Sequence, residues 1–292
     1  MFIQLLFNGL VVGSSCVLLG IGLNLSYLGS GFFNISYGSV LVLAAYTFCT
    51  AHQEMQLGIV PSSLLAAVSA IAMAIAQERI VFEPLRRLSA SSQILLLCSI
   101  ALLIIVQNGI SLIFGDQARN VQGPEVGEGL TFLPLRVMPL QIATMVTATT
   151  VAVFAWVFLK YAETGKQIRA LASDSELSAV VGIHRARLRL LSGSLGAITA
   201  TLSAVLATCE NGAEPAMGFN AALLGVVTLV VGGVGSIGGA VLAGLFLGIV
   251  RQLAIGWFPG QWQDGIVFII LFLFVLIRPQ GLLGSPARRK AT

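Results

Sequence analysis

Charged residues are scarce in this chain: Asp, Glu, Lys and Arg together make up 10% of its 292 residues. Soluble domains carry about 25% charged residues. The hydrophobic share is 57%, and the mean hydropathy is +0.94. Several apolar runs approach the ~20 residues that a helix needs to cross a bilayer. The composition therefore excludes an ordinary soluble domain and predicts a protein that crosses a membrane several times.

Motifs of several catalytic and binding classes are also missing. No GxxxxGK[ST] sequence occurs, so the chain has no P-loop with which to bind ATP. The four cysteines lie apart in apolar segments, without a CxxC pair or a metal-ligand spacing: Cys16, Cys49, Cys98 and Cys209. We interpret them as small buried hydrophobic residues and expect no metal site.

Two further classes are excluded by what the apolar segments lack. They hold no interior series of acidic or basic residues, which a proton- or sodium-driven pump would need. Gly233, Gly235 and Gly238 form a GxGxxG pattern, but a dinucleotide site requires a strand before it and a surface helix after it. The isoelectric point of about 9.1 indicates basic cytoplasmic loops rather than nucleic-acid binding.

The apolar segments predict an all-α polytopic bundle, a single domain over 1–292 with about eight or nine membrane segments. The N-terminal sequence MFIQLLFNGL lacks the basic region of a signal peptide and is interpreted as the start of the first span. The expected segments are 4–28, 33–52, 58–77, 93–114, 139–159, 190–209, 221–234, 237–256 and 265–278.

The basic residues predict the orientation of this bundle. Of the 16 Lys and Arg, three lie in 78–92, six in 160–189 and four from Arg278 to the C-terminus. Because cytoplasmic loops are rich in Lys and Arg, we expect both loops and the tail 279–292 in the cytoplasm. The loop 115–138, with few basic residues, is expected outside.

Two glycine-rich breaks interrupt the apolar segments, one from Gly29 to Ser39 and one from Gly232 to Gly239. Paired interruptions of this kind indicate the substrate path of a transporter with repeated halves. The alternative is close helix packing through GxxxG pairs such as Gly244 and Gly248. The candidate path residues are Asn34, Ser36, Tyr37 and Gly38 in the first break and Gly233, Gly235, Ser236 and Gly238 in the second.

The stretch from Thr164 to Ile183, TGKQIRALASDSELSAVVGI, is an amphipathic sequence in a charged loop. It predicts one helix or two short helices that meet at Ser173, where Ser173 and Glu176 fit a capping box. The segment is either a linker on the lipid headgroups or a docking element for a cytoplasmic partner. The second alternative suits a transporter that has neither a P-loop nor ion-coupling residues.

This stretch resembles the cytoplasmic signature loop of ATP-binding-cassette importer permeases of the branched-chain amino-acid type. The matching positions are Gly165, Arg169, Ala170, Asp174, Glu176, Ala179, Gly182 and Ile183. The resemblance extends over nearly the whole chain. It includes ERIVFEPLRRLSASSQILLLCSIALLIIVQN from Glu78, and VVGGVGSIGGAVLAGLFLGIV and LIRPQGLLG in the C-terminal third.

The resemblance implies a multi-pass permease subunit in the inner or plasma membrane of a prokaryote, not an enzyme. Such a subunit passes branched-chain amino acids inward or, in close relatives, urea and short amides. Its partners would be cytoplasmic ATPase subunits that bind the ATP, a second related permease and an extracytoplasmic binding protein. Gly165 to Ile183 would couple it to the ATPase. An autonomous channel or facilitator is the competing class, and it would need no coupling surface.

The chain departs from the family pattern in the first break. The family usually has His-Gly and an acidic residue where this sequence has Tyr37, Gly38 and Ser39. Two interpretations stay open: these positions contact the cargo, or they brace the helix.

Overall fold

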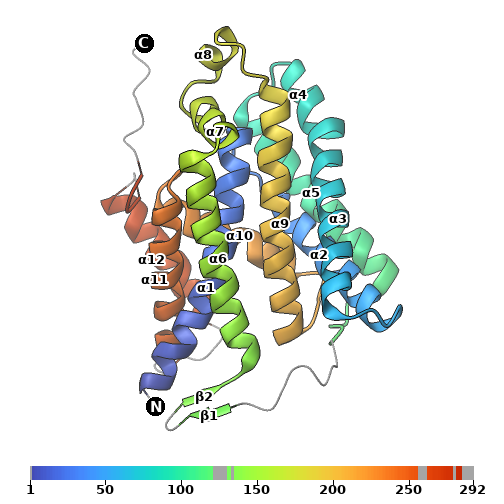
Figure 1. The fold of residues 1–292 in the computed structure, drawn as a ribbon, viewed down its shortest axis with the longest axis vertical. Coiled ribbons are helices and arrows are strands. Elements are labelled where there is room, and N and C mark those ends of the chain that lie inside the picture. Colours follow the sequence, from blue (N-terminus) through green and yellow to red (C-terminus); the bar gives the residue numbers. More distant parts are fainter. Residues whose placement is uncertain (1, 121–129, 133–134, 256–261, 279–280, 285–292) are drawn as a thin grey trace.

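The computed structural model describes residues 2–120, 130–132, 135–255, 262–278 and 281–284. Its helices pack side by side into one bundle, which confirms the all-α class with one short hairpin added (Figure 1). The elements are α1 (Phe2–Ser30), α2 (Tyr37–Gln53), α3 (Ile59–Gln77), the π-helical turn η1 (Glu78–Phe82), α4 (Glu83–Arg87), α5 (Ser92–Phe114), β1 (Leu130–Phe132), β2 (Leu135–Val137), α6 (Pro139–Tyr161), α7 (Glu163–Ser173), α8 (Ser175–Val180), α9 (Arg185–Asn211), α10 (Met217–Gly232), α11 (Ile237–Ile255) and α12 (Gln263–Ile277).

Each of the nine expected apolar segments coincides with a helix, but the helices differ in length. Among the described residues, six are long and apolar enough to cross a membrane: Ile3–Ser30, Ile59–Arg87, Ser92–Phe114, Pro139–Tyr161, Arg185–Asn211 and Ile237–Ile255. The helices α10 and α12 are apolar but shorter. At 1.5 Å per residue, the 15 residues of α12 span less than the ~30 Å of a bilayer core.

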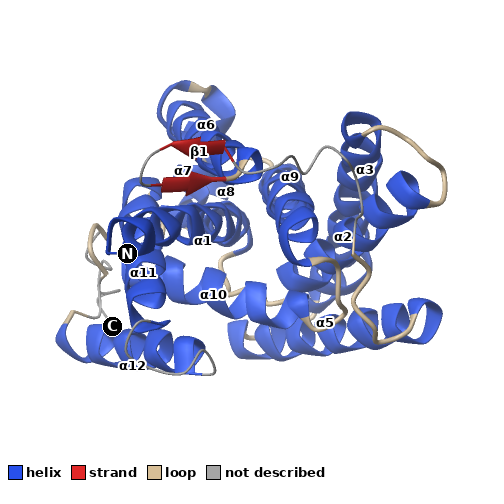
Figure 2. Cartoon of the chain, turned by 90° about the horizontal axis from the view of Figure 1, so that it is seen from below, coloured by secondary structure: helices blue, strands red, loops and turns tan. Residues whose placement is uncertain are grey.

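Helix α1 forms the centre of the bundle. About 61% of its most apolar window is buried, against 17–22% for the windows of α3, α5 and α6. It packs most closely against α11, where a side chain at Gly13 would meet the backbone of Gly244 and Leu245. The GxxxG interpretation is therefore confirmed for the pair Gly244 and Gly248, both of which face α1. Figure 2 shows α10 lying among α1, α2, α11 and α12, all of which it contacts.

The basic break 78–92 is mostly helical, which differs from the expected loop. Helix α3 continues through η1 and α4 to Arg87. The charges of this extension pair with one another: Arg86 forms an ion pair with Glu78, and Arg87 lies 2.7 Å from Glu83. The Arg87–Glu83 pair has the i,i+4 spacing that stabilises a helix, and the paired charges are compatible with a helix that continues beyond its apolar part.

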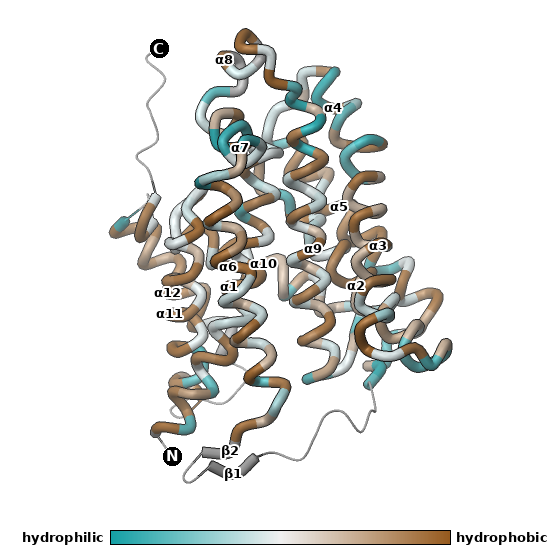
Figure 3. Tube along the Cα trace, in the orientation of Figure 1, coloured by the Kyte–Doolittle hydropathy of each residue, from teal (hydrophilic) through white to brown (hydrophobic). Residues whose placement is uncertain are grey.

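The two expected sides of the membrane lie at opposite ends of the bundle. Helices α4, α7 and α8 stand at one end and the hairpin of β1 and β2 at the other (Figure 1). The strands are antiparallel, with Leu130 opposite Val137. Hydrophilic residues gather around α4 and α7 (Figure 3). Parts of the loop 115–138 and most of the tail 279–292 lie outside the described residues.

Candidate functional site

The first interruption runs from Gly31 to Ser36, between α1 and α2. Gly31 has φ +76°, and its N–H donates to the Tyr27 carbonyl at 2.8 Å, so a left-handed residue ends α1. The chain then turns back along α1. The Tyr37 hydroxyl consequently lies against Gly22 of α1, where a side chain would overlap it. This turn brings Ser36, which is fully buried, into the interior of the bundle.

A buried network of polar side chains holds this turn. The Ser36 Oγ lies 2.6 Å from Asn34 Oδ1 and 2.9 Å from Gln77 Oε1, and its proton bonds to one of these acceptors. The Gln77 amide donates to Ser39 Oγ at 2.7 Å, and the Ser39 hydroxyl donates to the Ser36 carbonyl at 2.6 Å. The Ile35 N–H donates to a hydroxyl of α5 at 3.1 Å. Helices α3 and α5 therefore fix the interruption from outside α1 and α2.

A polar cavity of about 30 Å³ lies beside this network. A volume of this size suits about one water molecule. Its polar lining comes from α1, the first interruption, the start of α2, the end of α3, η1 and α9: Ser26, Ser30, Asn34, Tyr37, Gln77, Glu78 and Arg189. Of the predicted path residues, Asn34 and Tyr37 line the cavity. Ser36 instead bonds to the network, and Gly38 packs against the backbone of Gly218 in α10.

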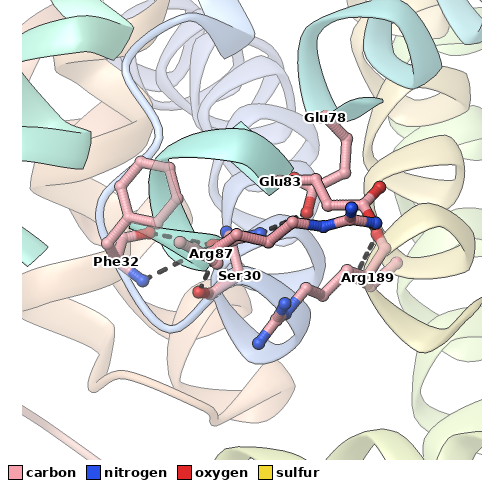
Figure 4. A network of polar contacts seen from close by, with 8 residues as sticks. Ser30, Phe32, Glu78, Glu83, Arg87 and Arg189 are labelled. Atoms are coloured by element: carbon pink, nitrogen blue, oxygen red, sulfur yellow. Dashed lines mark hydrogen bonds and ion pairs between the residues drawn. The ribbon is translucent and has the colours of Figure 1, made fainter. Parts of the chain in front are cut away.

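A cluster of charges lies at the α4 end of the cavity (Figure 4). Arg86 bonds to the Glu78 carboxylate and donates to the Ser30 carbonyl at 3.3 Å. Its guanidinium also stacks over the Phe32 ring, 5.5 Å from the ring centroid. Arg86 thus ties the end of α1 to the extension of α3.

The second interruption, Gly233 to Ser236, has different surroundings. Gly233 and Gly235 have φ +99° and +85°, conformations that favour glycine. Asn24 of α1 bonds this turn twice: its amide donates to the Ser236 carbonyl at 3.0 Å and its Oδ1 accepts from the Gly235 N–H at 3.1 Å. The Ser236 hydroxyl accepts from the Gly239 N–H at 3.0 Å and so caps α11.

The chain after α12 closes the other side of this turn. The N–H groups of Leu282 and Leu283 donate to the last carbonyls of α10, at 2.8 and 3.1 Å. These bonds satisfy carbonyls that the end of a helix leaves unpaired. None of the second set of predicted path residues (Gly233, Gly235, Ser236 and Gly238) lines the cavity beside the first interruption.

The Thr164–Ile183 stretch folds as two helices, α7 and α8, as one of the two sequence alternatives predicts. The break is at Asp174, whose carboxylate accepts from the Leu177 N–H at 3.0 Å. Asp174 therefore caps α8, one residue after the expected Ser173. Gly165 is needed at the start of α7, because a side chain there would overlap the backbone of Phe158.

The apolar stripe of α7 faces the bundle rather than solvent. Ile168 and Leu171 are buried and pack with residues of α1, α6 and α9. The predicted coupling residues Arg169 and Ala170 are exposed on the opposite side, and Asp174 is exposed at the break. The side chains of Glu176 and Ala179 lie outside the described set.

The exposed apolar surface of this end belongs to α8 and the turn after it. Leu177, Val180 and Val181 are 65%, 86% and 73% exposed. Gly182 follows with φ +84°, and the Ile183 N–H donates a hydrogen bond to the Ser178 carbonyl at 3.0 Å. A groove of about 620 Å³ runs beside this turn, lined by Thr164, Gln167, Val181, Gly182, Ile183, His184, Arg187, Leu188 and Leu191.

Comparison with known protein families identifies the chain. The family model described as the branched-chain amino acid transport system permease component matches residues 5–276. The chain belongs to this permease family.

Individual permeases of the family match over almost their full length. The high-affinity branched-chain amino acid transport system permease protein LivH of Escherichia coli (strain K12) is 31% identical, covering 99% of this chain and 97% of LivH. LivH of Salmonella typhimurium is 30% identical with the same coverage. The corresponding protein BraD of Pseudomonas aeruginosa is 30% identical, covering 99% and 98%.

A solved structure shares the fold of this permease. PsaBC from Streptococcus pneumoniae, in complex with a Fab, aligns with a TM-score of 0.54 and 14% sequence identity. The alignment covers 96% of this chain and 93% of the other. At this identity the similarity concerns the fold alone.

Sequence reasoning missed several residues that the structure places at these sites. Gln77 and Arg189 border the cavity, yet each lies at the polar edge of an apolar segment and so resembled a solvated helix end. Asn24 is a single polar residue in an apolar segment, and its partners in the second interruption lie more than 200 residues away. Leu177 and Val180 are apolar residues of the Thr164–Ile183 stretch, and their exposure depends on how α8 is oriented after the break at Asp174.

Proposed function

We propose that this permease is one membrane subunit of an ATP-binding-cassette importer that carries branched-chain amino acids into the cell. The observation that carries the proposal is the segment of α7 and α8, which protrudes at one end of the bundle next to the groove lined by Gly182 and Ile183. The chain itself has no P-loop. A subunit that cannot bind ATP needs a surface through which an ATPase moves it. Partner ATPase subunits bind and hydrolyse the ATP, and this chain is not an enzyme.

The complete importer contains three other kinds of component. They are two cytoplasmic ATPase subunits, a second related permease and an extracytoplasmic binding protein, which selects the cargo. The names and near-complete coverage of the matched relatives support this assembly.

The distribution of basic residues supports the orientation. Nine of the 16 Lys and Arg lie in 78–92 and 160–189, at the end of the bundle where α4, α7 and α8 stand, so this end faces the cytoplasm of a prokaryotic cell, together with the C-terminus. We propose that the six long helices cross the inner membrane. The shorter α2, α10 and α12 complete eight or nine membrane segments.

The surroundings of the first interruption limit the departure from the family pattern to one position of the proposed path. Ser39 is fully buried and bonds to Gln77 and Ser36, so it braces the helix and does not line the cavity. Tyr37 does line it. Only one of the two departures therefore contacts the proposed path.

Reconstitution tests the proposal. The chain is placed in lipid vesicles alone or with its ATPases, second permease and binding protein, and uptake of labelled leucine is measured. We expect uptake only with the complete set and ATP. Leucine flux through the isolated chain without ATP would show a facilitator instead, and a complete set without leucine uptake would refute the cargo.

A substitution at Gly182 tests the coupling surface. Nothing lies within 4 Å of a side chain built at this position, so Gly182→Val acts only through its φ of +84°. A branched residue there costs about 1–3 kcal/mol, so we expect leucine uptake to fall by about tenfold or more. Gly109→Val, in an equally open position of α5, is the control. Wild-type uptake by the Gly182→Val importer would make α7 and α8 a linker.

A further inference from the structure

Arg189 is a cation without an ion partner at the polar cavity. Within the described part of the chain its guanidinium makes no hydrogen bond and no ion pair, and its Nε atom is buried without a partner. It nevertheless lines the cavity beside the first interruption. The side chain is half-buried, and a buried donor atom that lacks an acceptor costs about 1–3 kcal/mol. Ionisable residues inside a membrane protein therefore mark substrate or ion pathways.

The neighbouring carboxylates do not supply the missing charge. Glu78 is already paired with Arg86, and Glu83 with Arg87 (Figure 4). The group of Glu78, Arg86 and Arg189 consequently carries one net positive charge. A ligand with a single negative group would neutralise it.

We infer that Arg189 binds the α-carboxylate of the amino acid as it passes the inner half of the permease. This inference rests on the proposed function. A guanidinium is suited to this role because it binds a carboxylate through two parallel hydrogen bonds. The rest of the cavity lining matches the remainder of an aliphatic amino acid. Val40, Ala74 and Ala197 offer apolar contacts, and Asn34 offers an amide oxygen to an ammonium group.

The position of Arg189 links this contact to the motor. In the described conformation the cavity holds about 30 Å³, room for about one water molecule, so an amino acid enters only when the surrounding helices separate. Arg189 lies in the second turn of α9, the helix that directly follows the groove beside α8. An ATPase that displaces α8 would therefore move the carboxylate contact and release the cargo.

Binding by the assembled importer, purified without its binding protein, tests the inference directly. Leucine is compared with leucinamide, which carries a neutral amide in place of the carboxylate, by saturation-transfer NMR. The wild type should prefer leucine, and Arg189→Gln should lose this preference. Arg79→Gln removes the same charge from an exposed position at the same end of the bundle and should keep it.

Uptake with the binding protein present gives the second readout. Loss of a charge-assisted hydrogen bond predicts that Arg189→Gln slows leucine uptake by about tenfold to a hundredfold while ATP hydrolysis persists. Wild-type uptake would overturn the inference, as would a parallel loss of ATPase activity, which would place Arg189 at an interface. If Arg189→Gln does not assemble, Arg189→Lys decides: its uptake should fall, because an ammonium cannot bind two oxygens in parallel. A wild-type importer without leucine uptake would refute the proposed function instead.

Discussion

The two helix interruptions have similar glycine-containing sequences and opposite surroundings. The first, Gly31 to Ser36, borders a polar cavity and is held by hydroxyl and amide side chains. The second, Gly233 to Ser236, is enclosed by Asn24 on one side and by the backbone of Leu282 and Leu283 on the other. A glycine-rich break therefore shows only where a helix ends. Its neighbours decide whether the break lines a path or joins two helices.

This difference predicts separate consequences for the two interruptions. Changes in the second should lower the stability of the bundle, because its groups bond only to protein. Changes in the first should affect transport more than stability, because we propose that the cargo passes the cavity beside it.

The largest effect is expected where α10 and α11 meet. A side chain at Gly239 would overlap the Gly232 carbonyl, so Gly239→Val forces the two helix ends apart. We expect the free energy of unfolding in detergent to fall by about 3 kcal/mol. At Gly238 the nearest atom is a Leu283 methyl at 3.6 Å, an ordinary contact, so Gly238→Ala should be neutral or slightly stabilising. An equal loss of unfolding free energy in the two variants would show that the ends of α10 and α11 are not tightly packed at Gly239.

An intermediate effect is expected at Asn24. Asn24→Leu removes two hydrogen bonds and leaves the Gly235 N–H without its acceptor. The expected loss of unfolding free energy is about 1–2 kcal/mol, the upper range for side-chain bonds between membrane helices. Asn108→Leu is the control, since Asn108 is exposed and, among the described residues, bonds only to the Ile104 carbonyl of its own helix. If both variants are equally stable, Asn24 is not what holds the second interruption.

The sequence was sufficient to predict what depends on local hydrophobicity. The positions of the apolar helices, both glycine breaks and the pair of short helices after Thr164 follow from residues that are near one another in the chain. Burial in lipid or in the bundle selects the same residue types, so the number of crossings does not follow from hydropathy. Helices α10 and α12 illustrate this, because their composition is apolar but each is shorter than the helices that are long enough to cross the membrane completely.

The sequence was insufficient where partners are distant. Asn24 bonds to Ser236, 212 residues away, and Ser36 bonds to Gln77, 41 residues away. The extension of α3 was missed for a related reason. Its charges predict a loop when each is considered alone, but Glu83 and Arg87 form an i,i+4 pair and Glu78 is paired with Arg86, so the segment can remain helical.

The smallest change in stability, with a large change in transport, is expected at Gln77. In Gln77→Leu both serine hydroxyls keep an acceptor, because Ser36 bonds to Asn34 Oδ1 at 2.6 Å and Ser39 to the Ser36 carbonyl at 2.6 Å. The unfolding free energy should therefore fall by only about 1 kcal/mol or less. Leucine uptake should fall more steeply, because Gln77 lines the cavity and its amide is one of the polar groups that the cavity offers to a ligand.

The matched control for this comparison is Gln107→Leu. Gln107 is a half-buried glutamine of α5 that has no hydrogen bond within the described residues and lies outside the cavity. Its replacement should change neither unfolding nor uptake. A Gln77→Leu variant that loses stability as strongly as Asn24→Leu and keeps wild-type uptake would reverse the comparison. The first interruption would then be a structural joint like the second, and the path would have to lie on another face of the bundle.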